Sequence, residues 1–118
     1  MAKIDLTPLS EIDGFTAAAL VDSTSGLSLA SYGTGIDLEL AAAGNTEVLK
    51  AKMKTAEALK LRDTIDDILI TLGKQYHLLR PLDKNSSLFL YLVLDRQKSN
   101  LAMARHELRV FEKELDFS

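Results

Sequence analysis

The sequence predicts a single α+β domain, residues 1–118, with the element order α-β-β-α-β-β-β-α. Three observations lead to this prediction. Apolar segments of strand length are separated by tight turns, two longer segments repeat apolar residues with the period of a helix, and residues 88–94 are apolar at every position. Because short turns can join only antiparallel strands, the five strands should form an antiparallel sheet flanked by helices. A chain of 118 residues has room for one core.

The N-terminal third predicts a short helical turn followed by a β-hairpin. Thr7 fits an N-cap and Pro8 the first helical position, and Gly14 offers a stop, so the turn should span residues 8–12. Residues 15–22 are small and apolar, a polar turn ends at Gly26, and residues 27–31 then alternate with period two.

A long helix should follow the hairpin and run to about Leu61, with either Thr34 or Asp37 as its cap. At 100° per residue its apolar residues form two stripes. The first contains Leu38, Ala42, Leu49, Met53 and Ala56; the second contains Ala41, Gly44, Val48, Ala51, Thr55 and Ala58; Glu39, Glu47, Lys50, Lys54 and Glu57 lie on the remaining side. A helix that rests only on its own sheet needs one apolar stripe, so the second indicates that another backbone approaches it closely.

The second half of the chain predicts three strands and a last helix. Residues 65–72 and 76–80 should pair across a turn at Gly73, and residues 83–86 form the next turn. Residues 88–94 should lie in the centre of the sheet, because a strand that is apolar on both faces needs cover on both sides. From about Gln97 a helix presents one apolar stripe, which consists of Leu101, Ala104, Leu108, Phe111 and Leu115.

Composition excludes several classes of partner and compartment. The net charge is -3, and no basic patch compensates locally, which argues against binding to nucleic acid or to an anionic membrane. The absence of cysteine suits a reducing compartment and excludes thiolate chemistry. The N-terminus lacks the apolar run of a signal peptide, and residues 88–94 are too short to span a bilayer. We therefore expect a cytoplasmic location and no membrane span.

No group of residues has the spacing of an active site, a metal site or a cofactor site. Asp63, Asp66 and Asp67 lack a partner at ligand spacing and are expected to be solvated at the start of a strand. His77 and His106 stand singly and should be surface or half-buried residues. The segment from Gly33 to Gly35 lacks the lysine and the glycine spacing of a phosphate loop, and no serine lies in a nucleophile elbow. We expect no enzyme and no cofactor.

Two segments resemble the roadblock (dynein light chain) family. The first is DGFTAAALVD at residues 13–22 with GLSLA at residues 26–30, and the second is LVLDRQKSNLAMAR at residues 92–105. The resemblance implies a profilin-like five-stranded sheet and a homodimer formed through the third strand and the long helix. The short first helix and the longer first turn, at Ser23, Thr24 and Ser25, depart from the family pattern.

The resemblance also implies a non-enzymatic adaptor or regulator that binds other proteins, among them small Ras-like GTPases. The expected dimer interface consists of Gly44, Val48, Ala51, Thr55 and Ala58 with Ile68 and Ile70, and the expected partner contacts are Glu47, Lys50 and Lys54. The alternative is a small-ligand sensor of the PAS-like or GAF-like type, whose sheet has the same general form. The gap-free apolar core pattern argues against that alternative.

Overall fold

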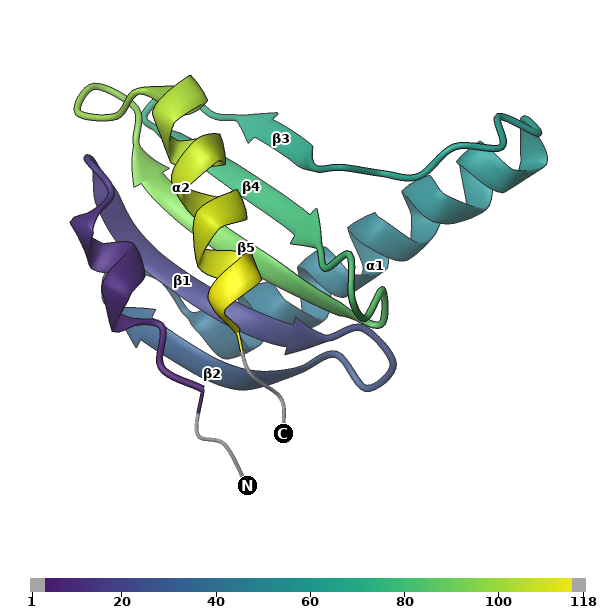
Figure 1. Ribbon diagram of the computed structural model, residues 1–118, viewed down its shortest axis with the longest axis horizontal. Helices are drawn as coiled ribbons and strands as arrows, with labels where there is room; N and C mark the ends of the chain where they lie inside the picture. The colour runs from purple at the N-terminus through teal and green to yellow at the C-terminus, as the bar shows by residue number, and fades with distance from the viewer. Residues whose placement is uncertain (1–3, 116–118) are drawn as a thin grey trace.

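The computed structural model describes residues 4–115, and it contains the predicted elements in the predicted order (Figure 1). The elements are η1 (Thr7–Glu11), β1 (Phe15–Asp22), β2 (Leu27–Gly33), α1 (Leu38–Ala58), β3 (Ile68–Thr71), β4 (Gln75–Pro81), β5 (Leu88–Asp95) and α2 (Leu101–Glu114). They form one five-stranded antiparallel sheet with the strand order β2-β1-β5-β4-β3.

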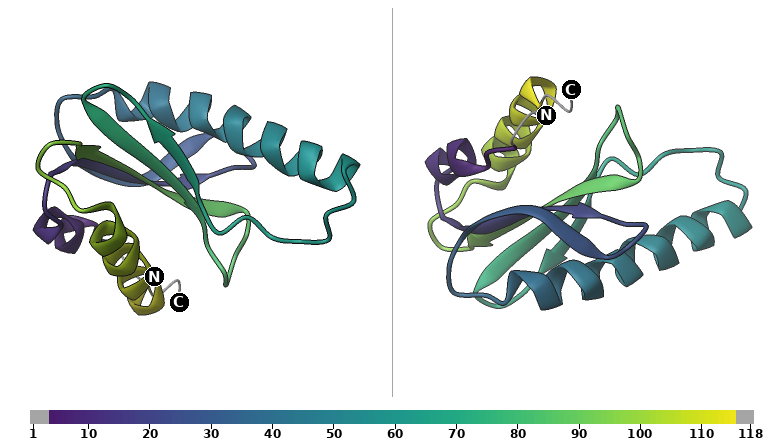
Figure 2. Two further views of the ribbon diagram at one scale, coloured as in Figure 1. Left: turned by 90° about the horizontal axis from the view of Figure 1, so that it is seen from above. Right: turned by 90° about the horizontal axis from the view of Figure 1, so that it is seen from below.

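Helices cover both faces of this sheet. α1 lies across one face, while α2 and the short η1 lie side by side on the other (Figure 2). β5 occupies the centre, paired with β1 on one side and with β4 on the other. β2 and β3 are the two edges.

The two faces have separate apolar cores, and β5 contributes alternate residues to each. Leu90 and Leu92 pack with Leu108 of α2 on one face, whereas Phe89 and Tyr91 belong to the core beneath α1. Every residue of β5 from Leu88 to Leu94 is buried. The prediction that this strand is central and covered on both sides is confirmed.

The first helical segment differs in detail from the prediction. It is a 3₁₀ helix that begins at Thr7, and Leu6 occupies the capping position without a side-chain hydrogen bond. Thr7 therefore does not cap it. Instead the Asp5 carboxylate accepts hydrogen bonds from the backbone N–H and the hydroxyl of Thr7, at 3.0 Å each.

α1 begins as one of the two alternatives predicts and ends earlier than expected. The Asp37 carboxylate accepts a hydrogen bond from the N–H of Leu40 at 3.1 Å, so Asp37 is the cap rather than Thr34. The helix stops at Ala58, because Lys60 and Arg62 turn the chain with left-handed backbone angles, φ 57° and 53°. Its last turns extend beyond the edge of the sheet (Figure 1).

Two other boundaries lie later in the chain than the sequence pattern indicates. β3 begins at Ile68 instead of residue 65, so Asp66 and Asp67 precede the strand. α2 begins at Leu101, because the side chain of Asn100 caps it by accepting a hydrogen bond from the N–H of Met103 at 3.1 Å. Residues 97–100 form the turn between β5 and α2.

Gly33 at the end of β2 is required by close packing as well as by its backbone angle. Its φ is 101°, and a Cβ added there would meet the carbonyl oxygen of Thr16 and lie 2.6 Å from the Cα of Ala17. We expect Gly33→Ala to lower the free energy of unfolding by about 2 kcal/mol or more in chemical denaturation. Gly73→Ala is the matched control, because a Cβ at Gly73 meets nothing within 4 Å. Equal losses in the two variants would show that packing at Gly33 is not the cause.

Candidate functional site

The predicted contact surface on α1 is exposed in the single chain. The small-residue stripe consists of Gly44, Val48, Ala51, Thr55 and Ala58. All five residues are exposed to solvent. Val48 has 41% of its surface exposed, and a Cβ added to Gly44 meets nothing within 4 Å. The chain's own packing therefore does not require small residues at these positions.

The other stripe of α1 packs on the sheet, as predicted. Ala42 and Leu49 are buried against β1 and β5, and Leu38 and Met53 pack around them. Thr46 is also buried, which the apolar pattern did not indicate; its hydroxyl donates to the carbonyl of Ala42 at 2.7 Å.

Ile68 and Ile70 lie on the edge strand β3 and are half-buried. Both pack against the core beneath α1, so their side chains point to the sheet face that α1 covers. Because β3 is the last strand of the sheet, its outer edge pairs with no other strand among the described residues 4–115. The structure thus places Ile68 and Ile70 on the same side of the sheet as α1, next to a free strand edge.

A polar network on this face shows which flank of α1 is turned toward β4 and β3. The hydroxyl of Tyr91 lies 3.0 Å from Nδ1 of His77, and Nε2 of His77 lies 2.9 Å from Oε1 of Gln75. Burial raises the pKa of Tyr91, and a hydrogen bond with Asn45 of α1 partly offsets the rise. At 100° per residue, Asn45 lies on the same flank as Val48, between the buried side and the small-residue stripe. This flank of α1 therefore faces Tyr91 of β5, whose hydroxyl is hydrogen-bonded to His77 of β4.

His77 is half-buried, one of the two settings that the sequence predicts for it. The missed feature is its contact with Tyr91, whose rings meet edge to face with centroids 5.5 Å apart. Desolvation by burial lowers the pKa of His77. Side chains alternate between the two faces of a strand, and residues two positions away from His77 and from Tyr91 belong to the core beneath α1. This alternation could have placed His77 and Tyr91 on the same face of the sheet.

The expected partner-binding residues form a separate, charged side of α1. Glu47, Lys50 and Lys54 are exposed and lie away from the sheet. They are thus available to a partner, and they do not approach Ile68 or His77 in the helical projection.

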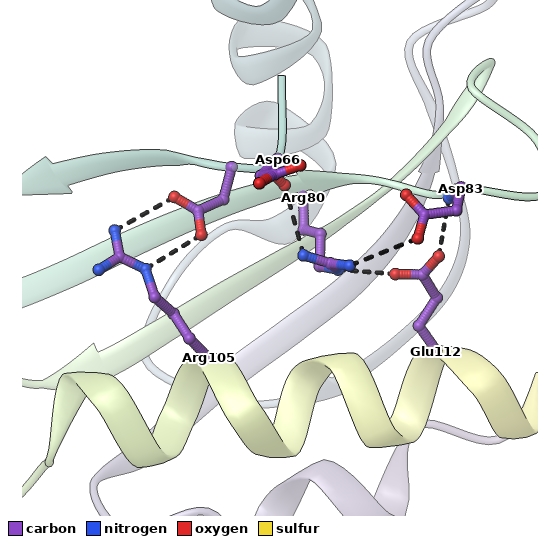
Figure 3. Close-up of polar contacts among 6 residues, drawn as sticks. Asp66, Arg80, Asp83, Arg105 and Glu112 are labelled. Atoms are coloured by element: carbon purple, nitrogen blue, oxygen red, sulfur yellow. Dashed lines mark hydrogen bonds and ion pairs between the residues drawn. The ribbon is translucent and has the colours of Figure 1, made fainter. Parts of the chain in front are cut away.

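Two arginines hold the segment before β3 against the rest of the molecule (Figure 3). Arg105 of α2 forms a two-pronged pair with the carboxylate of Asp67, at 3.0 and 3.1 Å. Arg80 of β4 donates to Oε1 of Glu112 at 2.6 Å and reaches the backbone oxygen of Asp66 at 3.5 Å. The second oxygen of Glu112 accepts from the N–H of Asp83 at 2.7 Å.

These contacts correct one prediction. Asp67 is not a solvated residue: its side chain is 17% exposed and paired with Arg105. Asp63 and Asp66 are exposed, as expected. Within residues 4–115, no group of three or more histidine, aspartate and glutamate side chains is arranged to hold a metal ion.

The pair between Arg105 and Asp67 should contribute modestly to stability, because the arginine side chain is 34% exposed. We expect Arg105→Ala to lower the free energy of unfolding by about 1 kcal/mol. Arg109→Ala on the exposed side of the same helix is the control and should be nearly neutral. Urea denaturation of both variants makes the comparison, and an equal effect would remove a special role for the pair.

A cavity of about 610 Å³ lies where the end of α1 passes beyond the sheet. It is lined by Met53, Ala56, Glu57, Lys60, Arg62, Asp63, Thr64, Ile65, Pro81, Leu82, Asp83 and Ser86. The lining contains apolar residues together with charged residues of both signs. None of the helices in the described part of the chain is long and apolar enough to cross a membrane.

Comparisons with known proteins identify the fold. No family model and no curated protein matches the sequence. Among solved structures, a Roadblock/LC7 domain from Streptomyces avermitilis is similar, with 16% identity, a TM-score of 0.79 and 93% of each chain covered. The gliding protein MglB from Thermus thermophilus is similar with 16% identity and a TM-score of 0.77, over 91% of this chain and 79% of that one. An MglB in a tetrameric arrangement has 16% identity and a TM-score of 0.69, over 92% and 85% of the two chains.

These similarities extend over nearly the whole chain. The expected profilin-like architecture is therefore confirmed, and the molecule described here has the fold of the Roadblock/LC7 domain.

Proposed function

We propose that this protein is a homodimeric adaptor that regulates a partner protein, a small Ras-like GTPase, and performs no chemistry of its own. Two observations carry the proposal: the small-residue stripe of α1 is exposed, and the outer edge of β3 pairs with no strand among the described residues 4–115. A second copy related by a two-fold axis would pair β3 with β3 and cover both stripes, since a two-fold interface uses the same patch on both subunits. The similarity to an MglB in a tetrameric arrangement supports self-association.

The GTPase as partner rests on the resemblance to the roadblock family and on the likeness to the gliding protein MglB. The exposed charges of Glu47, Lys50 and Lys54 lie beside the stripe on α1, so each would occur twice around the two-fold axis. A partner that spans the axis would meet both sets. Charged residues at such a rim affect the association rate and the salt dependence of binding.

Calorimetry with Ras-like GTPases from the same genome, loaded with GDP or with a GTP analogue, tests this assignment. We expect saturable binding to one of them, with a preference for one nucleotide state. Lys50→Glu combined with Lys54→Glu should weaken binding at least tenfold while the protein stays dimeric. Lys113→Glu on α2 is the matched charge reversal at an exposed position and should leave binding unchanged. Absence of binding to every candidate would exclude the GTPase, and turnover of a small molecule by the domain alone would exclude the adaptor.

The cavity at the end of α1 favours one other candidate, a small-ligand sensor. Its volume of about 610 Å³ falls within the range of small-molecule sites. Ile65→Trp would fill part of it, so a ligand detected by a thermal shift should lose its effect in that variant. A ligand whose effect is the same in both proteins does not bind there.

A further inference from the structure

We propose that His77 makes the homodimer sensitive to pH, so that the dimer forms at neutral pH and dissociates in weak acid. This inference rests on the proposed function, because it requires a dimer formed through α1 and β3. It concerns the regulation of that interface by the chain's own residues.

His77 lies next to the proposed contact surface, one strand in from the edge strand β3. On β4 it pairs with Ile70 of β3 on one side and with Val93 of β5 on the other. Its half-buried imidazole is on the sheet face that α1 covers, and Asn45 turns the Val48 flank of α1 toward it through Tyr91. The imidazole therefore occupies the floor between α1 and the edge strand, where the helix of a second copy would lie.

The hydrogen bonds of His77 fit a neutral ring that carries its proton on Nε2. The amide oxygen Oε1 of Gln75 can only accept, so Nε2 of His77 carries a proton and donates to it. Nδ1 is then unprotonated and accepts from the hydroxyl of Tyr91. A second proton on Nδ1 would force that hydroxyl to become the acceptor and would place a charge beneath α1.

The carboxylate of Asp95, which lies opposite Gln75 on β5, accepts a hydrogen bond from the N–H of Gln97 at 3.0 Å. β4 supplies Gln75, β5 supplies Tyr91, and β3 supplies the apolar Ile70. On α1 the flank turned toward Tyr91 contains Asn45 and, in the helical projection, the exposed Lys52. Burial already lowers the pKa of His77 in the single chain.

A second copy would remove more water from His77 and cover it with the small, uncharged side chains of its own stripe. The pKa of His77 should then be lower in the dimer than in the monomer. Because the pKa of His77 is lower in the dimer, protons bind preferentially to the monomer. The dimer is thus fully stable above the pKa that His77 has in the monomer and weakens as the pH falls through it.

The effect is doubled by symmetry, because each dimer contains two copies of His77. Between the pKa that His77 has in the dimer and the pKa that it has in the monomer, the dissociation constant can rise by up to about 100-fold per pH unit. We therefore expect a larger dissociation constant at pH 5.5 than at pH 7.5.

Sedimentation equilibrium at these two pH values tests the inference with the full chain, its His77→Gln variant and its His106→Gln variant. The sequence has two histidines, and His106 is exposed on α2, so His106→Gln is the matched control. The dissociation constants of wild type and His106→Gln should rise in acid, whereas that of His77→Gln should stay nearly constant. The same rise in His77→Gln, or no rise in wild type, would overturn the inference.

A second measurement does not depend on the folding of His77→Gln. Titration of the imidazole protons by NMR should give a lower pKa for His77 in the wild-type dimer than in a monomeric Ala51→Arg variant, and equal values would contradict the inference. A wild type that is monomeric at pH 7.5 at 100 micromolar would remove the proposed homodimer itself. A dimer with one dissociation constant at both pH values would leave the proposed function intact and overturn only the role of His77.

Discussion

Ala51→Arg should convert the protein from a dimer into a monomer at micromolar concentration, as measured by light scattering. Ala51 lies in the middle of the small-residue stripe and is exposed in the single chain, so arginine fits there without disturbing the fold. In a two-fold dimer the substitution places two long cations where two helices approach each other closely. The two helix backbones could then no longer approach each other closely, and the two cations would repel each other. Together these effects should raise the dissociation constant of the dimer at least 100-fold.

Ala43→Arg provides the matched control for this experiment. Ala43 is exposed on the same helix, but it lies on the flank away from β3, so the same change of side chain should leave the dimer intact. Hydrogen exchange should report the interface directly: backbone amides of Ile68–Thr71 should exchange faster in Ala51→Arg than in Ala43→Arg. A wild type that scatters as a 13.0 kDa species would refute the prediction before any variant is made.

Truncation of the central leucines should have the largest effect on folding. Leu90 and Leu92 of β5 are completely buried and Leu108 of α2 is 1% exposed, all in one apolar core. Replacement of any of them by alanine should lower the free energy of unfolding by about 2 to 5 kcal/mol, through lost burial and a cavity that the sheet cannot close. Thermal and chemical denaturation at a fixed protein concentration measure this loss.

Lys54→Ala and Glu57→Ala are the controls, because both side chains are exposed on α1. Each should change stability by less than about 0.5 kcal/mol. If these variants melted as early as the leucine variants, the assignment of the buried and exposed faces would be wrong.

Much of the fold could be predicted because its elements have strong local patterns. β5 carries seven consecutive buried apolar residues, and the apolar stripe of α2 is buried at Ala104, Leu108 and Phe111. The buried side of α1 was also predicted, since Leu38, Ala42, Leu49 and Met53 repeat with the helical period. These patterns arise because burial against a neighbouring layer favours an apolar residue at each turn of a helix. On each face of a strand, burial favours an apolar residue at every second position.

The boundaries could not be predicted, because single polar contacts set them. Ile65 begins the apolar segment from which the longer strand is predicted, but Asp67 is paired with Arg105, which lies 38 positions later. Arg80 and Glu112 are 32 positions apart, and nothing in the local pattern of either indicates that they form a buried pair. Likewise the left-handed turn at Lys60 and Arg62 has no glycine to signal it.

The small-residue stripe of the candidate site repeats with the helical period and is visible in the sequence, and these residues are exposed in the structure. That they form a dimer interface stays a prediction. The network of Tyr91, His77 and Gln75 joins two strands and becomes evident only when their register is known.

The central place of β5 has a consequence for how the chain acquires its structure during synthesis. The hairpin of β1 and β2 and the hairpin of β3 and β4 share no backbone pairing with each other, and β5 is the strand that joins them. Until Leu88–Asp95 has left the ribosome, the nascent chain can hold only two separate hairpins, each with an unpaired edge and an uncovered apolar face. Formation of the complete sheet should therefore wait until β5 has emerged from the ribosome. A nascent chain arrested before residue 88 should remain sensitive to protease, and one released after α2 should become resistant in a single cooperative step.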